Sequence, residues 1–453
     1  MSDRTYKRKR LTTRRGILAG LSILLVALMI LAACGEAATP TPTVADDEPP
    51  TPVPATEAPD ATEVPDEPDA PEPTAIPDEP DDTMDTGVRP RSEWTVDNPA
   101  TLEELETEIE KYRGSSFVFT SWGGAYQAAQ RQAYIVPFSQ QFGIEIVEES
   151  PMEYAVIRVM VDTGNYKWHV MDVGGRELWN HINIGALAEL DLSVVDNRNH
   201  VETVSTPYGG GGGITWSTVL AYNSDVYAEG SITTWADFFD RENYPGRRSV
   251  RDAYRGSWFS ALLANDSSRL EDSDWRARLG APTDEDVQEA LGLWESNPPD
   301  GFWHTGSDCP QTLIAGDYDM CTAWNGRIYN AQVEGEPLAI CWECGHLVGT
   351  GAFVMAKGLE ESNPEAFDLG QLFIAWTGLP EINANISKYI TYGPLNLRSA
   401  EFMVGDEFDP ITPALPTSAA NAPFAVIEDE KYSGEKNSEW TDLWQEYLLA
   451  IDL

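Results

Sequence analysis

The cysteine at position 34 has neighbours that suit covalent modification of its sulfur. It follows Leu31-Ala32-Ala33 and precedes Gly35. A thiolate is a good nucleophile, and small residues before it give a peptidase access to the backbone. We therefore expect cleavage after Ala33 and acylation of Cys34. The alternative is a buried free cysteine beside a helix.

The segment before Cys34 has the features of an export signal. Basic residues gather between Arg4 and Arg15, and an uncharged run extends from Gly16 to Ala33. The last residues resemble the lipobox of bacterial lipoproteins, which implies an extracytoplasmic protein, lipid-anchored to the outer face of the cell membrane or periplasmic. The run also borders on the length of a membrane span, so an uncleaved anchor is the alternative. The pair Arg14-Arg15 leaves open whether export is general or twin-arginine.

Four more cysteines follow much later in the chain, at Cys309, Cys321, Cys341 and Cys344. An even number in an oxidising compartment predicts two disulfides, whose pairing the spacing does not determine. A four-thiolate zinc site is the alternative.

Residues 34–92 read as a lipidated cysteine followed by a disordered spacer. They contain 14 of the 31 prolines and 16 acidic residues, with two bases, Arg89 and Arg91. Such a composition buries too little apolar surface to offset the entropy of ordering. We expect this segment to hold a folded part away from the membrane.

The charge of the chain limits its partners. The formal net charge is −44, which excludes nucleic acid as a partner and suits a cationic ligand that such a field would attract. Alternatively, the negative charge is a solvated acidic surface that reflects the habitat of the organism. The roughly 360 residues after the spacer are enough for two domains.

Strand and helix patterns alternate along the folded part. Examples are the expected strands Ser116–Thr120, Ile144–Glu148 and Trp168–Val173, which predict an α/β fold with mainly parallel sheets and helices on both faces. Ligands bind such sheets at the carboxyl ends of strands. Trp122, Tyr126 and the turn Gly174-Gly175-Arg176-Glu177 fall at such ends, so Glu177 is a candidate. The run Gly209 to Gly213 is typical of a flexible loop.

Signatures of catalysis are missing from the sequence. It contains no HExxH, GxSxG or P-loop pattern, and its five histidines are scattered without metal-ligand spacing. We therefore expect no enzyme, cofactor or metal. A secreted hydrolase using paired carboxylates and a surface adhesin remain alternative classes.

Six short stretches occur in an order that resembles one family. They are Ser121-Trp122-Gly123-Gly124-Ala125-Tyr126-Gln127, Tyr222-Asn223-Ser224-Asp225, Thr234-Trp235-Ala236-Asp237-Phe238, Tyr244-Pro245-Gly246, Ala323-Trp324-Asn325-Gly326-Arg327 and Tyr392-Gly393-Pro394-Leu395-Asn396. Together they resemble the polyamine-type solute-binding proteins of ABC importers, which have the type II periplasmic binding fold.

The resemblance implies two lobes that close on a ligand between them. Lobe 1 would span 93–217, lobe 2 would span 218–350, and 351–453 would return to lobe 1, with C-terminal helices able to cross again. Crossing strands are expected near 214–222 and 350–356. The implied partners are a small amine and ABC permease subunits, with the chain as a monomer.

The resemblance also implies a set of ligand-binding residues. Trp122 and Trp324 would offer aromatic faces to a cation, and Asp252 would accept its hydrogen bonds. The matching stretches add Gly123, Asn325 and Tyr392 to this set, and Tyr126 lies one helical turn beyond Trp122.

The sequence departs from the polyamine binders at two places. Arg255 stands where they tend to carry a second acid, and Gly349-Thr350-Gly351 stands near the second crossing strand, where they tend to have an aspartate. Arg255 suits a carboxylate or phosphate. The predicted ligand is therefore a small polyamine-like cation, or alternatively an amino acid or opine that carries both charges.

Overall fold

The computed structural model describes residues 88–451 of the chain. The expected signal segment, Cys34 and most of the expected spacer lie outside the described residues. The chain divides into residues 1–81 and 82–453, and the described helices and strands all belong to the second unit. Between residues 88 and 451, no helix has the length and apolar character needed to cross a membrane.

The described residues contain a single hydrogen-bonded sheet of eleven strands. The strands are β1 (Ser116–Thr120), β2 (Glu145–Glu149), β3 (Val170–Gly174), β4 (Gly210–Asn223), β5 (Arg248–Arg251), β6 (Gly301–Trp303), β7 (Met320–Trp324), β8 (Leu338–Cys341), β9 (His346–Val354), β10 (Gly393–Pro394) and β11 (Ala425–Ile427).

Helices cover this sheet. The α-helices are α2 (Leu102–Ile109), α3 (Gly124–Gln130), α4 (Val136–Phe142), α5 (Tyr154–Thr163), α6 (Gly175–Asn183), α7 (Trp235–Phe239), α8 (Tyr254–Asn265), α9 (Ser273–Gly280), α10 (Asp284–Ser296), α11 (Asp308–Ile314), α12 (Asn325–Val333), α13 (Leu359–Ser362), α14 (Pro364–Gly378), α15 (Pro380–Asn383) and α16 (Glu430–Ile451). A π-helical turn, Arg131–Ile135, joins α3 to α4.

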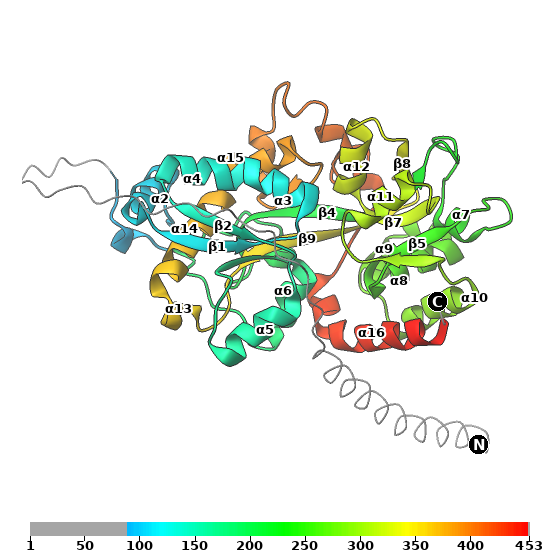
Figure 1. Cartoon of the computed structure of the whole chain (residues 1–453), viewed down its shortest axis with the longest axis horizontal. Helices are drawn as coiled ribbons and strands as arrows, with labels where there is room; N and C mark the ends of the chain where they lie inside the picture. The colour runs from blue at the N-terminus through cyan, green and yellow to red at the C-terminus, as the bar shows by residue number, and fades with distance from the viewer. Residues whose placement is uncertain (1–87, 452–453) are drawn as a thin grey trace, which may run out of the picture. The chain divides into compact units, whose positions relative to one another are not determined.

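Two long strands run through the middle of the sheet and join its two halves (Figure 1). β4 and β9 are antiparallel to each other; β9 pairs with β3 on one side, and β4 pairs with β7 on the other. Outside them β1 is parallel to β2 and β3, and β5 is parallel to β6 and β7. The expected α/β fold with two crossing strands is confirmed. We call the half built on β1, β2 and β3 lobe 1 and the half built on β5, β6 and β7 lobe 2.

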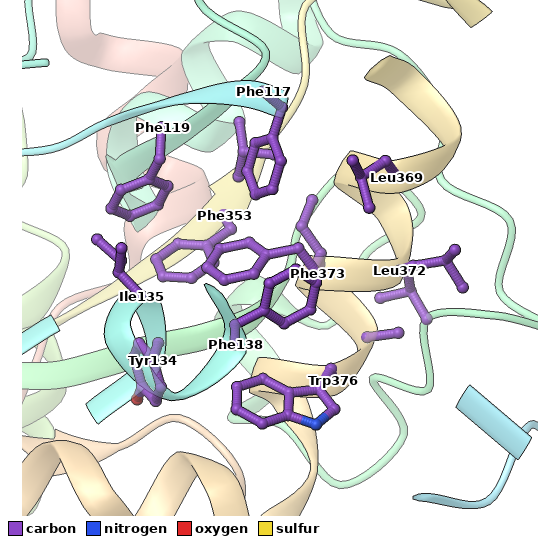
Figure 2. Close-up of a cluster of buried hydrophobic side chains, with 14 of the residues drawn as sticks. Phe117, Phe119, Tyr134, Ile135, Phe138, Phe353, Leu369, Leu372, Phe373 and Trp376 are labelled. Carbon is purple, nitrogen blue, oxygen red and sulfur yellow. The ribbon is translucent and has the colours of Figure 1, made fainter. Parts of the chain in front are cut away.

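Lobe 1 has an aromatic core between its sheet and α14 (Figure 2). The ring of Phe373 lies 5.2 Å from Phe117 and 5.1 Å from Phe138 between centroids, and it stacks on Phe353 at 6.1 Å. Each of these rings is fully buried. Because burying one such ring contributes roughly 1.5–3 kcal/mol, this core fixes β1 and β9 in position relative to α14.

The C-terminal helix completes the core of lobe 2. Trp440 and Trp444 of α16 pack in the same cluster as Trp258 of α8. The same helix also packs closely on α6 of lobe 1, since a Cβ atom added at Gly434 would lie 2.7 Å from the Cβ of Trp179. The C-terminal helix therefore contacts both lobes.

The glycine run is not a flexible loop. Gly210 to Gly213 are buried and begin strand β4. A Cβ atom at Gly212 would lie 2.8 Å from the ring of Tyr134, and one at Gly213 would lie 2.0 Å from the carbonyl oxygen of Gly351. The loop interpretation was wrong because these glycines let neighbouring strands and rings approach the backbone closely.

The folded part begins earlier than the composition indicated. The guanidinium of Arg89 binds Glu104 with Nε 2.6 Å from Oε1, and Nη2 of Arg91 lies 2.5 Å from Oδ1 of Asp368. These two arginines are the bases that the sequence assigned to the spacer. Their ion pairs fasten residues 89–91 to lobe 1.

Candidate functional site

One cavity of the described residues lies where the crossing strands pass between the lobes. Its empty volume, which includes open solvent at the mouth, is about 590 Å³. Seventeen residues line it: Trp122, Tyr126, Tyr154, Asp172, Gly174, Gly175, Arg176, Glu177, Ile214, Trp216, Arg251, Arg255, Trp324, Arg327, Gly351, Tyr392 and Glu430.

Aromatic rings from both lobes meet in the cavity. Trp122 follows β1 and Trp324 ends β7, and their ring centroids are 6.2 Å apart in an edge-to-face arrangement. Trp216 of β4 packs edge-on against Trp324 at 5.6 Å, and Tyr154 packs against Trp122 at 5.5 Å. All four side chains are partly exposed, so they can stack against an apolar or cationic part of a ligand.

Lobe 2 presents three arginines to the cavity. Arg251 ends β5, Arg255 lies in the first turn of α8, and Arg327 lies in the first turn of α12. The guanidinium of Arg251 lies 4.9 Å from the ring centre of Trp324, and that of Arg255 lies 4.1 Å from the ring centre of Trp216. The tryptophans thus hold the guanidinium groups against the cavity wall.

Several guanidinium nitrogens of the arginines that line the cavity carry N–H groups without a hydrogen-bond acceptor among the described residues. In the described part of the chain, Nη2 of Arg255, Nε of Arg327 and both Nε and Nη1 of Arg176 are buried without a hydrogen-bond partner. Burial lowers the pKa of Arg251 to about 10, so it stays charged at neutral pH. Buried donors without partners are costly, and a carboxylate accepts from guanidinium groups with suitable geometry.

Lobe 1 presents two acids and one base. Asp172 of β3 is fully buried, and its Oδ2 accepts hydrogen bonds from Gln130 Nε2 at 2.7 Å and Ser121 Oγ at 3.2 Å. Burial raises the pKa of Asp172 to about 7 despite these bonds. At the start of α6, Nη2 of Arg176 lies 3.3 Å from Oε1 of Glu177. An acid with so strong a shift in a cavity is a functional candidate.

Most of the residues predicted from the sequence lie on the cavity. Trp122, Tyr126, Glu177, Arg255, Trp324 and Tyr392 all line it. So does the whole turn Gly174-Gly175-Arg176-Glu177, which follows the carboxyl end of β3 as expected.

Asp252 is not among the lining residues. Strand β5 ends at Arg251, just before Asp252, and neighbouring residues along an extended chain point to opposite faces. The carboxylate of Asp252 lies beside His304 instead, and the distance from its Oδ2 to Nδ1 of the imidazole is 3.5 Å. The acid that lines the cavity from a strand is Asp172 of β3, and Arg251 lines it from the end of β5.

Gly123 and Asn325 support the cavity from behind its surface. The carbonyl oxygen of Gly123 accepts a 3.2 Å hydrogen bond from Nη1 of Arg327. The side chain of Asn325 accepts from the Ser217 backbone at 2.9 Å and donates to the Thr391 carbonyl at 2.6 Å. Neither lines the cavity; Asn325 holds crossing strand β4 against the segment that carries Tyr392.

The sequence reasoning missed several lining residues. They are Tyr154, Asp172, Arg176 as a donor, Trp216, Arg251, Arg327 and Glu430. Asp172 could have been found from the sequence, because it is a lone acid in the predicted apolar strand before Gly174. A carboxylate buried in such a strand is costly, so its presence indicates a function. Glu430 carried no such signal, since it belongs to an acidic stretch with no recognisable motif.

The late cysteines are paired in space. The structure joins Cys309 to Cys321, with Cα atoms 6.5 Å apart, and Cys341 to Cys344, with Cα atoms 5.4 Å apart. Among residues 88–451, no group of three or more histidine, cysteine, aspartate or glutamate side chains is placed to hold a metal ion. The formation of both disulfides in the exported protein stays a prediction.

Comparison with known proteins shows the family. The family model for bacterial extracellular solute-binding proteins matches residues 133–417. The γ-aminobutyric acid-binding protein of Pseudomonas aeruginosa is 32% identical over 337 residues, which cover 73% of this chain and 91% of that protein.

Two solved structures are similar in fold and sequence. The agropinic acid complex of the periplasmic binding protein AgtB of A. tumefaciens R10 has a TM-score of 0.64 and 27% identity, covering 74% of this chain and 99% of that one. A GABA receptor structure has a TM-score of 0.62 and 26% identity, covering 73% and 97%. Such relatives bind solutes and are not enzymes. This chain belongs to the bacterial extracellular solute-binding proteins and is a substrate-binding protein of an ABC transporter.

Proposed function

We propose that the protein captures a small zwitterion, of the ω-amino-acid or opine kind, and delivers it to an ABC permease. The observation that carries this proposal is the uneven charge of the cavity. Strand β5 and helices α8 and α12 of lobe 2 contribute three arginines, whereas lobe 1 contributes Asp172 and Glu177 with one arginine. Glu430, at the start of α16, adds a third acid to the wall. A ligand with a carboxylate at one end and an ammonium at the other matches this division.

The carboxylate of the ligand would accept hydrogen bonds from the guanidinium groups of lobe 2. Arg255 and Arg327 both offer buried nitrogens without partners, and satisfying them removes a desolvation cost. The ammonium group would lie toward Asp172, whose Oδ2 accepts hydrogen bonds from Ser121 and Gln130. The rings of Trp122 and Trp324 would cover the methylene chain between them.

This proposal differs from the polyamine-like cation that the sequence favoured. A diamine would bring a second positive charge against the arginines of lobe 2, which costs binding energy in a cavity of low dielectric. The named ligands of similar proteins, γ-aminobutyric acid and agropinic acid, support the alternative in which the ligand carries both charges.

A thermal-shift panel tests the ligand class. The full chain in detergent is melted with γ-aminobutyrate, with butyrate, which lacks the ammonium group, and with putrescine, which lacks the carboxylate. We expect the zwitterion to raise the melting temperature most, because a ligand of the native state stabilises it by mass action. A larger shift with putrescine would contradict the proposal, and turnover of any probe would point to an enzyme.

We also propose that a lipid on Cys34 anchors the protein outside the cytoplasm. The motivation is the signal pattern that ends in Leu31-Ala32-Ala33-Cys34. Cys34→Ala should release the protein into the soluble fraction or leave it uncleaved, because the acylated sulfur is lost. Membrane fractionation with mass spectrometry of the N-terminus measures both. Normal cleavage together with unchanged membrane attachment would refute the anchor.

A further inference from the structure

The C-terminal segment from Ala425 to Glu430 reaches the ligand cavity. Its strand β11 runs parallel to β9, with Ile427 opposite Val348, and the backbone N–H of Glu428 donates to the Val348 carbonyl at 3.0 Å. Helix α16 then begins at Glu430. The segment therefore follows the crossing strand toward the cavity and places the carboxylate of Glu430 on its wall, whereas Glu428 is not among the lining residues.

Glu430 is held firmly at the cavity wall. It is 1% exposed, and its carboxylate accepts a hydrogen bond from the Thr350 backbone at 2.7 Å and another from the Thr350 hydroxyl. A Cβ atom on Gly175, the first residue of α6, would lie 2.0 Å from its Oε2. Position 175 must therefore be glycine for the carboxylate to fit against lobe 1.

Glu430 differs from the neighbouring acids in its charge partners. Glu428 pairs with Arg255, and Glu177 pairs with Arg176. Within residues 88–451 Glu430 takes part in no ion pair, although it shares the cavity with Arg176, Arg251 and Arg255. The charged groups that act on it are Glu428 of its own segment and Arg255 of α8.

Burial and the neighbouring Glu428 raise the pKa of Glu430 to about 7, against the opposing effect of Arg255. When ionised, the carboxylate places a buried negative charge on the wall of the cavity. Such a charge attracts an ammonium group and repels a second carboxylate.

We propose that Glu430 is a specificity-determining residue that excludes ligands with two anionic groups from this arginine-lined cavity. The inference rests on the proposed function, in which the cavity holds a zwitterion. Four arginines alone would favour a dianion over a zwitterion. The carboxylate of Glu430 acts together with Asp172 against this preference, because it repels the second anionic group while leaving a single carboxylate free to bind Arg251 and Arg327.

Calorimetric titration with two probes tests the inference. Glutarate and γ-aminobutyrate have carbon chains of similar length, but glutarate carries a second carboxylate in place of the ammonium group. Both are titrated into the full chain in detergent at pH 8, as wild type and as Glu430→Gln. We expect the ratio of the glutarate to the γ-aminobutyrate association constant to rise at least tenfold in the variant.

A matched control keeps the test specific. Glu435 lies on the same helix, outside the cavity, and Glu435→Gln removes the same charge from the chain without changing the ratio. Because Glu430→Gln alters a buried group, Glu430→Ala is measured as a second variant, and melting curves show that both are folded. An unchanged or lower ratio in the folded variants overturns the inference.

The same experiment separates this inference from the proposed function. If the wild type binds no γ-aminobutyrate, the choice of a zwitterion fails. The role of Glu430 is then decided by glutarate alone: a gain of glutarate binding in Glu430→Gln and Glu430→Ala supports it, and no gain overturns it.

Discussion

Lobe 1 and lobe 2 contribute the same kind of aromatic side chain to the cavity but opposite kinds of charge. Trp122 and Trp324 each follow or end a strand of their lobe, and their rings touch edge to face. Around them lobe 1 supplies Asp172, and lobe 2 supplies Arg251, Arg255 and Arg327. The rings from the two lobes thus form a shared aromatic slot for the ligand, and the charged side chains determine which way round the ligand binds in it.

This difference indicates how one fold can select different solutes. The aromatic walls attract any flat or methylene-rich ligand and add roughly 0.5–2 kcal/mol for each cation contact. Charge placement then decides which end of the ligand faces which lobe, because a mismatched charge in a desolvated cavity is costly. Selectivity can therefore change at single positions, such as Asp172 or Arg251, while the fold stays the same.

The largest expected effect comes from removing the charge of one lobe at a time. Asp172→Asn and Arg251→Gln should each lower the association constant for γ-aminobutyrate by about 30-fold or more. Loss of one partner of a buried charge pair costs about 2 kcal/mol or more of binding free energy. Calorimetry with butyrate and n-butylamine gives the matched controls. Asp172→Asn should leave butyrate binding within a few-fold, and Arg251→Gln should do the same for n-butylamine.

The pattern across the two variants decides whether the lobes differ as described. If both variants weaken the binding of butyrate and of n-butylamine to the same degree, the two lobes do not bind opposite ends of the ligand. Melting curves of both variants exclude general unfolding as the cause.

A smaller effect is expected from the shared aromatic slot. Trp324→Ala should weaken γ-aminobutyrate roughly 2- to 30-fold with little loss of stability, because the ring faces the cavity. Trp235→Ala is the control in the core of lobe 2, where the ring is fully buried. That variant should lose about 3–5 kcal/mol of unfolding free energy and keep its affinity once folded. If Trp324→Ala lost stability but kept its affinity, and Trp235→Ala lost affinity but kept its stability, the ligand site would not lie at Trp324.

The pH dependence of binding should include a contribution from Asp172 of lobe 1. Asp172 has a pKa raised to about 7 by burial, and an ammonium group beside it favours the ionised form and so lowers this pKa in the complex. Binding then releases a proton, so affinity should be level above about pH 7 and fall by up to about tenfold per pH unit below it. Titrations of wild type and Asp172→Asn between about pH 5.5 and pH 8.5 measure this; a profile unaffected by the substitution would assign the proton to another group.

The smallest expected effect is that of the acidic segment before the folded part. Deleting residues 40–80 removes many acids but no residue of either lobe. Affinity for γ-aminobutyrate and the melting temperature should therefore stay unchanged at physiological salt, where charges beyond about 8 Å are screened. A marked drop in either quantity would mean that this segment contributes to the folded part.

The fold could be predicted because it depends on local patterns. Strand β1 was predicted at its observed bounds, Ser116–Thr120, since apolar residues and flanking turn residues define it. The tryptophans beside strand ends were found for the same reason. The glycine run was misread because close contacts between distant segments, such as Gly213 with Gly351, leave no local signal.

The charged residues of the site were harder to predict than its rings. Whether Arg251 or Asp252 lines the cavity depends on where β5 ends, and a shift of one residue exchanges the two faces of a strand. Glu430 reaches the cavity only through the pairing of β11 with β9. Such long-range placement follows from the tertiary structure and from no pattern near position 430.

The division of charge between the lobes is tested most directly by a calorimetric comparison of γ-aminobutyrate and putrescine on the wild-type protein. The two ligands share a four-carbon chain and an ammonium group and differ in the charge at the other end, which we assign to the arginines of lobe 2. We predict that γ-aminobutyrate binds at least tenfold more tightly than putrescine at about pH 7.5. Tighter binding of putrescine would contradict the central claim that the two lobes hold opposite ends of a zwitterion.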